Sequence, residues 1–295
     1  MKMKISGFTF VKNALELDYP IVEAITSILP LVDEFWVAAG DSRDGTTEAI
    51  RAIGDPKVNI IESIWDPRLF VHGAINAEQT NLALSRCRGD WCLYLQADEV
   101  VHEKFLPIVK ESMKKNLNRP EVEGLLFDYI HFWGSYETRQ KARHWYRREI
   151  RVIRNGIGIS SWKSAQGFRR EGRKLKVVHS GAAIYHYGWV RNPRTMKKKL
   201  IALDSVHHGP DWIKKHHPDR EARFEYGSLK HLVLFTGTHP RVMAKRIAGK
   251  DWTVPPNPAV KHEHNRPWNR ALTYLENKFL GGYRIGEYKN YILIK

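Results

Sequence analysis

The sequence has little cysteine and no long apolar run. Its two cysteines, Cys87 and Cys92, are too few and too awkwardly spaced for a disulfide framework or a metal ribbon, so we expect buried thiols. No segment approaches the roughly 20 apolar residues that span a bilayer, and the N-terminal residues lack the pattern of a secretory signal. Internal repeats and low-complexity tracts are absent too. These absences argue against a secreted, membrane-spanning or repeat protein and predict a cytoplasmic one.

Acidic residues are outnumbered by basic ones. The 295 residues include 48 Lys and Arg against 32 Asp and Glu, a net charge of +16 and a pI near 9.8. Such a surface favours polyanions, phosphorylated ligands or an anionic membrane face, and charge alone does not choose among them. With 42% hydrophobic and 27% charged residues, the composition is that of an ordinary globular protein.

Strand-like and helix-like segments alternate over the first hundred residues. Apolar runs of strand length lie at residues 5–11, 35–39, 58–61 and 91–95. Helical patterns lie at residues 21–29, 46–53 and 75–88. The run at 91–95 is apolar on both faces, as a central strand covered on both sides must be. This order predicts an α/β fold with a mostly parallel sheet flanked by helices.

The pattern loosens after residue 120. Shorter strand candidates lie at residues 125–130, 150–153, 176–178 and 182–185, separated by basic loops that contain glycine. From about residue 195 the chain is rich in Lys, His and Pro, with two plausible helices at 195–205 and 271–280. We therefore expect a basic, partly helical C-terminal extension.

Acidic side chains follow two of the predicted strands. Asp41 and Asp44 come after the second strand, and Asp98 and Glu99 come after the fourth. Because ligands of open α/β sheets bind beyond the carboxyl ends of the strands, one cleft is expected to hold these carboxylates. Asp41 and Asp44 also suit a turn and a helix cap. Asp98 must reach solvent, pair with a cation or bear a desolvation cost, and Mg²⁺ or Mn²⁺ would relieve that cost.

Four short strings carry a family resemblance. They are Phe10-Val11-Lys12-Asn13, the run from Ala39 to Thr46, Asn81-Leu82-Ala83-Leu84, and the run from Gly89 to Glu99. In this order they resemble the N-terminal half of a family 2 glycosyltransferase with the Rossmann-like GT-A fold. The resemblance implies a catalytic domain over residues 1–200. Residues 201–295 would then form an extension on the acceptor side, an oligomer contact or a membrane dock.

The resemblance implies an inverting enzyme that moves a sugar from a nucleotide-diphosphate donor. The acceptor would be a glycan or glycolipid, as in the synthesis of a surface polysaccharide. Asp41 resembles the acid that binds the donor base, and Lys12 and Asn13 would lie beside the nucleotide. The full set of expected donor-binding residues is Lys12, Asn13, Asp41, Asp44, Asn81 and Gln96.

The resemblance also implies a divalent metal ion. Asp98 resembles the second acid of the Asp-X-Asp metal motif of the family, but Gln96 stands in place of the first acid, and an amide is a weaker ligand. The run from Tyr185 to Pro193 resembles the end of the catalytic domain, where His186 would be the second ligand. An imidazole ligand favours Mn²⁺ over Mg²⁺.

The general base is not identified by any motif. A carboxylate within reach of the acceptor hydroxyl is needed. Glu99 is one candidate beside Asp98, and Asp128, Glu149 and Glu171 lie in the middle segment that should form the acceptor side.

The middle of the chain interleaves cations and aromatic rings. Its members include Arg143, Trp145, Tyr146, Arg147, Arg148, Arg151, Arg154, Trp162, Phe168, Arg169, Arg170 and Arg173. Rings stack on sugars and arginines bind phosphate or carboxylate, which suits an anionic glycan or a lipid-linked acceptor. Single-stranded nucleic acid is bound by the same combination, so a nucleic-acid-binding protein is the alternative. The lysines at 197–199 are typical of a solvated helix face or, second, of peripheral contact with an anionic membrane.

Overall fold

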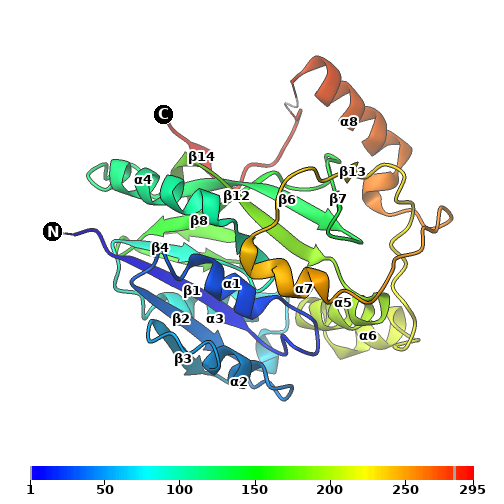
Figure 1. The fold of residues 1–295 in the computed structure, drawn as a ribbon, viewed down its shortest axis with the longest axis horizontal. Coiled ribbons are helices and arrows are strands. Elements are labelled where there is room, and N and C mark those ends of the chain that lie inside the picture. Colours follow the sequence, from blue (N-terminus) through cyan, green and yellow to red (C-terminus); the bar gives the residue numbers. More distant parts are fainter. Residues whose placement is uncertain (1, 282–283) are drawn as a thin grey trace.

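The computed structural model describes residues 2–281 and 284–295 and is built around one large twisted sheet (Figure 1). Part of this sheet is parallel, with β1 (Ile5–Val11), β2 (Glu34–Ala39), β3 (Val58–Glu62) and β4 (Trp91–Tyr94) in the order β4-β1-β2-β3. The connecting helices are α1 (Ile21–Ile28), α2 (Thr46–Arg51) and α3 (Ala74–Leu84). These elements confirm the α/β order that the sequence predicts.

Beyond β4 the sheet continues with both parallel and antiparallel strands. The further strands are β5 (Glu99–Val101), β6 (Gly124–Trp133), β7 (Thr138–Arg139), β8 (Arg148–Arg154), β12 (Lys176–Trp189), β13 (Val233–Leu234) and β14 (Ile292–Leu293). β8 lies antiparallel between β4 and β6, and β12 pairs parallel with β6. The carboxyl ends of β1, β4, β6 and β12 and the first residues of β8 therefore meet at one edge.

The strands predicted at 176–178 and 182–185 are one continuous strand. Gly181 has a φ of +78°, and the register with β6 shifts between His179 and Ala183. This bulge interrupts the alternation of side chains without ending the hydrogen-bonded ladder. A sequence pattern based on alternation therefore divides β12 into two pieces.

The remaining elements cover the faces and the edge of the sheet. A separate small sheet contains β9 (Ile159–Trp162), β10 (Gly167–Arg170) and β11 (Arg173–Lys174). The later helices are α4 (Leu106–Asn116), α5 (Pro193–His208), α6 (Pro210–His216), α7 (Ala244–Ala248) and α8 (Pro267–Phe279). Single 3₁₀ turns lie at Pro67–Leu69, Glu103–Phe105, Arg241–Met243 and Glu263–Asn265.

The C-terminal part of the chain is not separate from the main sheet. β13 pairs with β7 and β14 pairs with β12, so two strands after residue 201 extend the sheet formed by the first half (Figure 1). Helix α5 crosses residue 200 without a break. The division at residue 200 stays a prediction. No helix in the described ranges is long and apolar enough to cross a membrane.

Candidate active site

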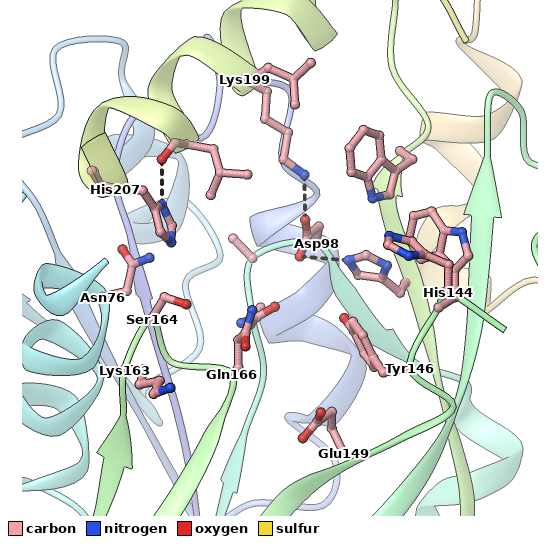
Figure 2. Close-up of a pocket in the computed structure, with 18 of the residues that line it drawn as sticks. Asn76, Asp98, His144, Tyr146, Glu149, Lys163, Ser164, Gln166, Lys199 and His207 are labelled. Atoms are coloured by element: carbon pink, nitrogen blue, oxygen red, sulfur yellow. Dashed lines mark hydrogen bonds and ion pairs between the residues drawn. The ribbon is translucent and has the colours of Figure 1, made fainter. Parts of the chain in front are cut away.

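A cavity of about 1200 Å³ opens where the parallel strands end. Lys12 after β1, Asp98 after β4, His186 near the end of β12 and Glu149 at the start of β8 all line it. Helix α5 contributes Lys199 from the opposite side, and Figure 2 shows its side chain reaching Asp98. The topology thus brings side chains far apart in the sequence to one edge of the sheet.

Asp98 is a buried carboxylate held by cations. Only 6% of the residue is exposed, and its Oδ2 accepts a hydrogen bond of 2.9 Å from Lys199 Nζ. Burial alone would raise the pKa of Asp98. The positive charges of Lys199, of His186 in its protonated form and of Arg191 outweigh that effect and hold the pKa well below its usual range. Asp98 is therefore a permanent anion at the base of the cavity.

His186 lies beside Asp98 as a neutral ring. Burial lowers the pKa of His186 to about 4 and that of its neighbour His131 to about 3. His131 Nε2 is 2.6 Å from the carbonyl oxygen of Tyr146, so this nitrogen carries the proton, and His131 Nδ1 accepts from His186 Nδ1 at 2.9 Å. His186 Nε2 then has a lone pair, 3.7 Å from Asp98 Oδ1.

Lys199 is the functional residue that sequence reasoning missed. We expected residues 197–199 to be a solvated face, but Lys199 is only 7% exposed and donates to Asp98 and, at 2.7 Å, to the carbonyl oxygen of Gly188. Its ammonium also lies 4.9 Å from the ring centre of Tyr19. Burial lowers the pKa of Lys199 to about 8, so the ammonium form still dominates at neutral pH. Its spacing from the buried Met196 at i, i+3 was the available signal.

The predicted donor loop lies at the rim of the same cavity. Lys12 Nζ is 2.7 Å from Asp41 Oδ1, which also accepts a hydrogen bond from the backbone N–H of Trp65. Lys12, Asn13 and Trp65 line the cavity, whereas the half-exposed Asp41 lies just behind Lys12. The two loops that follow β1 and β2 are therefore joined at the cavity mouth.

Comparison with known families supplies the decisive observation. The sequence pattern of the family described as "Glycosyl transferase family 2" matches residues 16–192. The chain belongs to glycosyl transferase family 2. The resemblance to this family and to its GT-A fold is thereby confirmed. A search of curated protein sequences gave no significant match.

Solved structures resemble this glycosyltransferase only in part. Mannosyl-3-phosphoglycerate synthase from Rubrobacter xylanophilus matches with 24% identity and a TM-score of 0.30, over 44% of this chain and 41% of its own. Glucosyl-3-phosphoglycerate synthase from Mycobacterium tuberculosis, in complex with Mn²⁺, UDP and phosphoglyceric acid, matches with 21% identity and a TM-score of 0.32, over 43% of each chain. TarS from S. aureus matches with 18% identity and a TM-score of 0.40, over 69% of this chain and 39% of its own. The chain spans less than half the length of these three structures.

Two predicted donor-binding residues of the glycosyltransferase, Asp44 and Asn81, make local contacts within the fold. Asp44 accepts hydrogen bonds from the backbone N–H of Glu16 and from Thr46, so it closes the turn before α2. Asn81 Oδ1 accepts from the backbone N–H of Ser161 and ties α3 to β9. Neither residue lines the cavity. Gln96 does line it, and its amide donates to the carbonyl oxygen of Ala165.

Three of the predicted bases do not reach the cavity. Glu99 is fully buried against Arg151, Asp128 pairs with Arg148, and Glu171 occupies the tight turn between β10 and β11 with a φ of +51°. None of the three lines the cavity, and a role of any of them as the base stays a prediction from the sequence.

Glu149 is the predicted base that lines the cavity. It is the second residue of β8, whose antiparallel direction places its first residues at the edge where β4 ends. Its Oε2 atom is buried and has no hydrogen-bond partner. Burial raises the pKa of Glu149 to about 7, and the nearby Arg151 only partly offsets this effect. A carboxyl group with such a pKa is suited to accept a proton near neutral pH.

Six of the eight arginines of the middle segment pair with acidic side chains within the fold. Arg143 faces Glu276, Arg147 faces Glu287, Arg148 faces Asp128, Arg151 faces Glu99, and Arg170 and Arg173 face Glu123. Ion pairs of this kind leave little of their charge for phosphate backbones. The nucleic-acid alternative gains no support from this segment.

The C-terminal segment at 284–291 forms one wall of the cavity. Glu287 in this segment pairs with Arg147 at 2.7 Å, and Arg284 donates to the carbonyl oxygens of Arg143 and Trp145. Arg284, Glu287 and Tyr291 line the cavity near Glu149. The wall beside the candidate base therefore comes from the last part of the chain.

The residues around Asp98 do not fit a divalent cation. Among residues 2–281 and 284–295, no three His, Cys, Asp or Glu side chains are grouped so as to hold a metal ion. Asp98 and His186 lie together as predicted, but the third expected position is the amide of Gln96, and the ammonium of Lys199 already occupies the Asp98 carboxylate. A divalent ion bound to Asp98 would lie next to that positive charge.

Proposed function

We propose that this glycosyltransferase moves a sugar from a nucleotide-diphosphate donor to a glycan or glycolipid acceptor, with inversion at the anomeric carbon. One observation carries the proposal: a single cavity contains the anchored anion–cation pair of Asp98 and Lys199 together with a separate carboxylate at Glu149, whose Oε2 has no hydrogen-bond partner. These are the parts that leaving-group stabilisation and proton removal require.

The donor side is formed by the loops after β1, β2 and β4. Lys12 and Lys199 both line the cavity and provide positive charge for the diphosphate, on which negative charge develops as the sugar departs. We assign the nucleotide base to Asp41, which pairs with Lys12 just behind the cavity lining, and to Asn13, which lines the cavity. The predicted Mn²⁺ or Mg²⁺ is not part of this proposal, because the ligands around Asp98 do not fit one.

Glu149 is the proposed general base. The acceptor hydroxyl gives its proton to the Glu149 carboxylate while its oxygen forms a bond to the anomeric carbon. The bond between that carbon and the diphosphate oxygen breaks, and the diphosphate leaves with the electron pair. Attack from the face opposite the leaving group inverts the configuration.

Aromatic rings favour a carbohydrate acceptor. Trp145, Tyr146, Trp162 and Trp189 line the cavity, and their flat faces can stack on the apolar faces of sugars. A place in surface polysaccharide synthesis, a cytoplasmic location and peripheral contact with an anionic membrane stay predictions from the sequence.

A binding and turnover experiment tests the proposal. UDP, GDP, CDP and ADP are added separately, with and without Mn²⁺, and the Tm is measured; the matching nucleotide sugars are then tested for release of the diphosphate. We expect one nucleotide to raise the Tm and Asp98→Asn to abolish turnover. Asp128→Asn is the matched control, because this half-exposed carboxylate lies outside the cavity. If no nucleotide binds, or Asp98→Asn retains full turnover, the proposal is wrong.

A further inference from the structure

Lys199 contacts the carboxylate that the family resemblance predicts to bind a metal ion. Its Nζ lies 2.9 Å from Asp98 Oδ2, and both side chains are about 9% exposed. The pair joins residues 101 positions apart in the sequence, the end of β4 and the inner face of α5 (Figure 2). A long, flexible side chain is buried here at a considerable entropic and desolvation cost, which a merely solvated lysine would avoid.

The side chains around Asp98 carry a net positive charge without a metal. At neutral pH Asp98 is influenced by two cations, Lys199 and Arg191, and Arg191 is fully buried. With His186 neutral, this cluster carries one net positive charge. A divalent ion in place of the Lys199 ammonium would raise this sum to two positive charges, because Arg191 stays. The ammonium therefore offers a departing diphosphate a positive partner that needs no metal.

The geometry leaves Lys199 able to reach a ligand. Two of the three N–H bonds of its ammonium point to acceptors, Asp98 Oδ2 and the carbonyl oxygen of Gly188. The third is available for an oxygen atom of a bound diphosphate, and Lys199 lines the cavity. Gly188 permits this close packing, since a Cβ there would come within 2.9 Å of Asp98 Oδ2.

The replacement at position 96 is consistent with the same arrangement. A second carboxylate at Gln96 would lie in the cavity with Asp98 and call for more positive charge than one ammonium supplies. The neutral amide removes that need. Relative to the Asp-X-Asp motif of the family, Gln96 removes one acid, and Lys199 supplies a cation where the motif would bind a metal ion. The two residues are therefore consistent with each other.

We propose that the transfer is independent of a divalent metal, and that the Lys199 ammonium, anchored by Asp98, binds the diphosphate of the donor and stabilises it as it leaves. This inference rests on the proposed function. Lys199 donates a hydrogen bond to a diphosphate oxygen and keeps its proton, while the electron pair of the broken bond stays on the diphosphate.

The first test uses the unmodified protein and Mn²⁺ itself. The paramagnetic resonance signal of free Mn²⁺ is recorded with protein and the best-binding nucleoside diphosphate, and Kd and turnover are measured in EDTA and in Mn²⁺. We expect no loss of the free Mn²⁺ signal beyond that caused by the nucleotide alone, with Kd and turnover equal within about twofold. Turnover that EDTA abolishes and Mn²⁺ restores would overturn the inference while leaving the proposed function intact. Failure to bind any nucleotide in both conditions would refute both.

The second test compares four proteins in EDTA. Lys199→Met is expected to weaken nucleoside diphosphate binding by about 10- to 100-fold, the range for loss of a charged hydrogen bond. Lys199→Arg should recover most of that loss, because it restores a cation. Lys198→Met is the control, since this neighbouring lysine is exposed and pairs with Glu16. A folded Lys199→Met protein with unchanged affinity and turnover would contradict the inference, and the Mn²⁺ test decides it if this variant does not fold.

Discussion

Replacing Glu99 by glutamine should destabilise the protein through its partner Arg151. The Glu99 carboxylate is fully buried and accepts two hydrogen bonds of 2.7 Å from Arg151. It also accepts from the Tyr129 hydroxyl at 2.7 Å and from the Gln96 backbone N–H at 3.0 Å. The substitution leaves a guanidinium with 1% exposure beside a neutral amide. Breaking a buried ion pair from one side costs about 3–5 kcal/mol.

This cost converts into a measurable change in Tm. An unfolding entropy of about 2.1 cal/mol/K per residue gives roughly 0.6 kcal/mol/K for a chain of this length, so the Tm of Glu99→Gln should fall by about 5–8 °C. Differential scanning calorimetry measures it. Glu121→Gln is the control, because its pair with Arg119 is exposed and the Tm should stay within about 1 °C of the unmodified protein.

A double variant distinguishes an effect of Glu99 on stability from an effect on turnover. Glu99→Gln combined with Arg151→Met removes both charges and should regain part of the lost stability. The reasoning would be refuted by a Glu99→Gln protein that melts like the unmodified one and has lost more than about a hundredfold in turnover. In that case Glu99 would take part in the chemistry after all.

Three further results are expected. Glu149→Gln should lower kcat by about 10²–10⁴ and remove a rate limb that rises with pH around an apparent pKa of about 7; a limb that persists in the variant would exclude Glu149 as the base. Gly188→Ala should reduce kcat/KM by about a hundredfold, because the new Cβ would lie 2.5 Å from His186 Nε2 and displace that ring. Unchanged kinetics in this variant would contradict the prediction. The free energy of unfolding should fall as the pH drops below about 6.5, because His131 and His186 have depressed pKa values in the folded protein and the unfolded chain takes up protons first. Urea unfolding should show a loss of up to about 2 kcal/mol per ring at pH 5. A constant free energy of unfolding between pH 7.5 and 5 would contradict this prediction.

Local patterns were sufficient for the first half of the fold. Strand β1 has the bounds expected from its apolar run, and α1 starts at Ile21, where the helical spacing begins. Asp98 was identified because a carboxylate directly after an apolar strand is unusual whatever surrounds it. Such features depend on a few neighbouring residues, and the sequence contains them directly.

Contacts between distant segments were not predictable in this way. The direction of β8 decides that Glu149 reaches the cavity, and strand direction is set by pairing with β4 and β6. Lys199 belongs to a run of three lysines, and only the packing of α5 separates its buried side chain from the exposed Lys198. Glu99 and Asp98 are adjacent in sequence, yet only the fold shows that one faces Arg151 inside the sheet and the other faces the cavity.

The wall formed by residues 284–291 has a consequence for how specificity can change. This segment borders the cavity beside Glu149, whereas Lys12 and Asp98 come from the first hundred residues. Under the proposed function, we expect substitutions in this segment to alter which molecule receives the sugar without disturbing how the nucleotide is held. Exchanging this stretch between related chains would then give new acceptors with the donor chemistry unchanged.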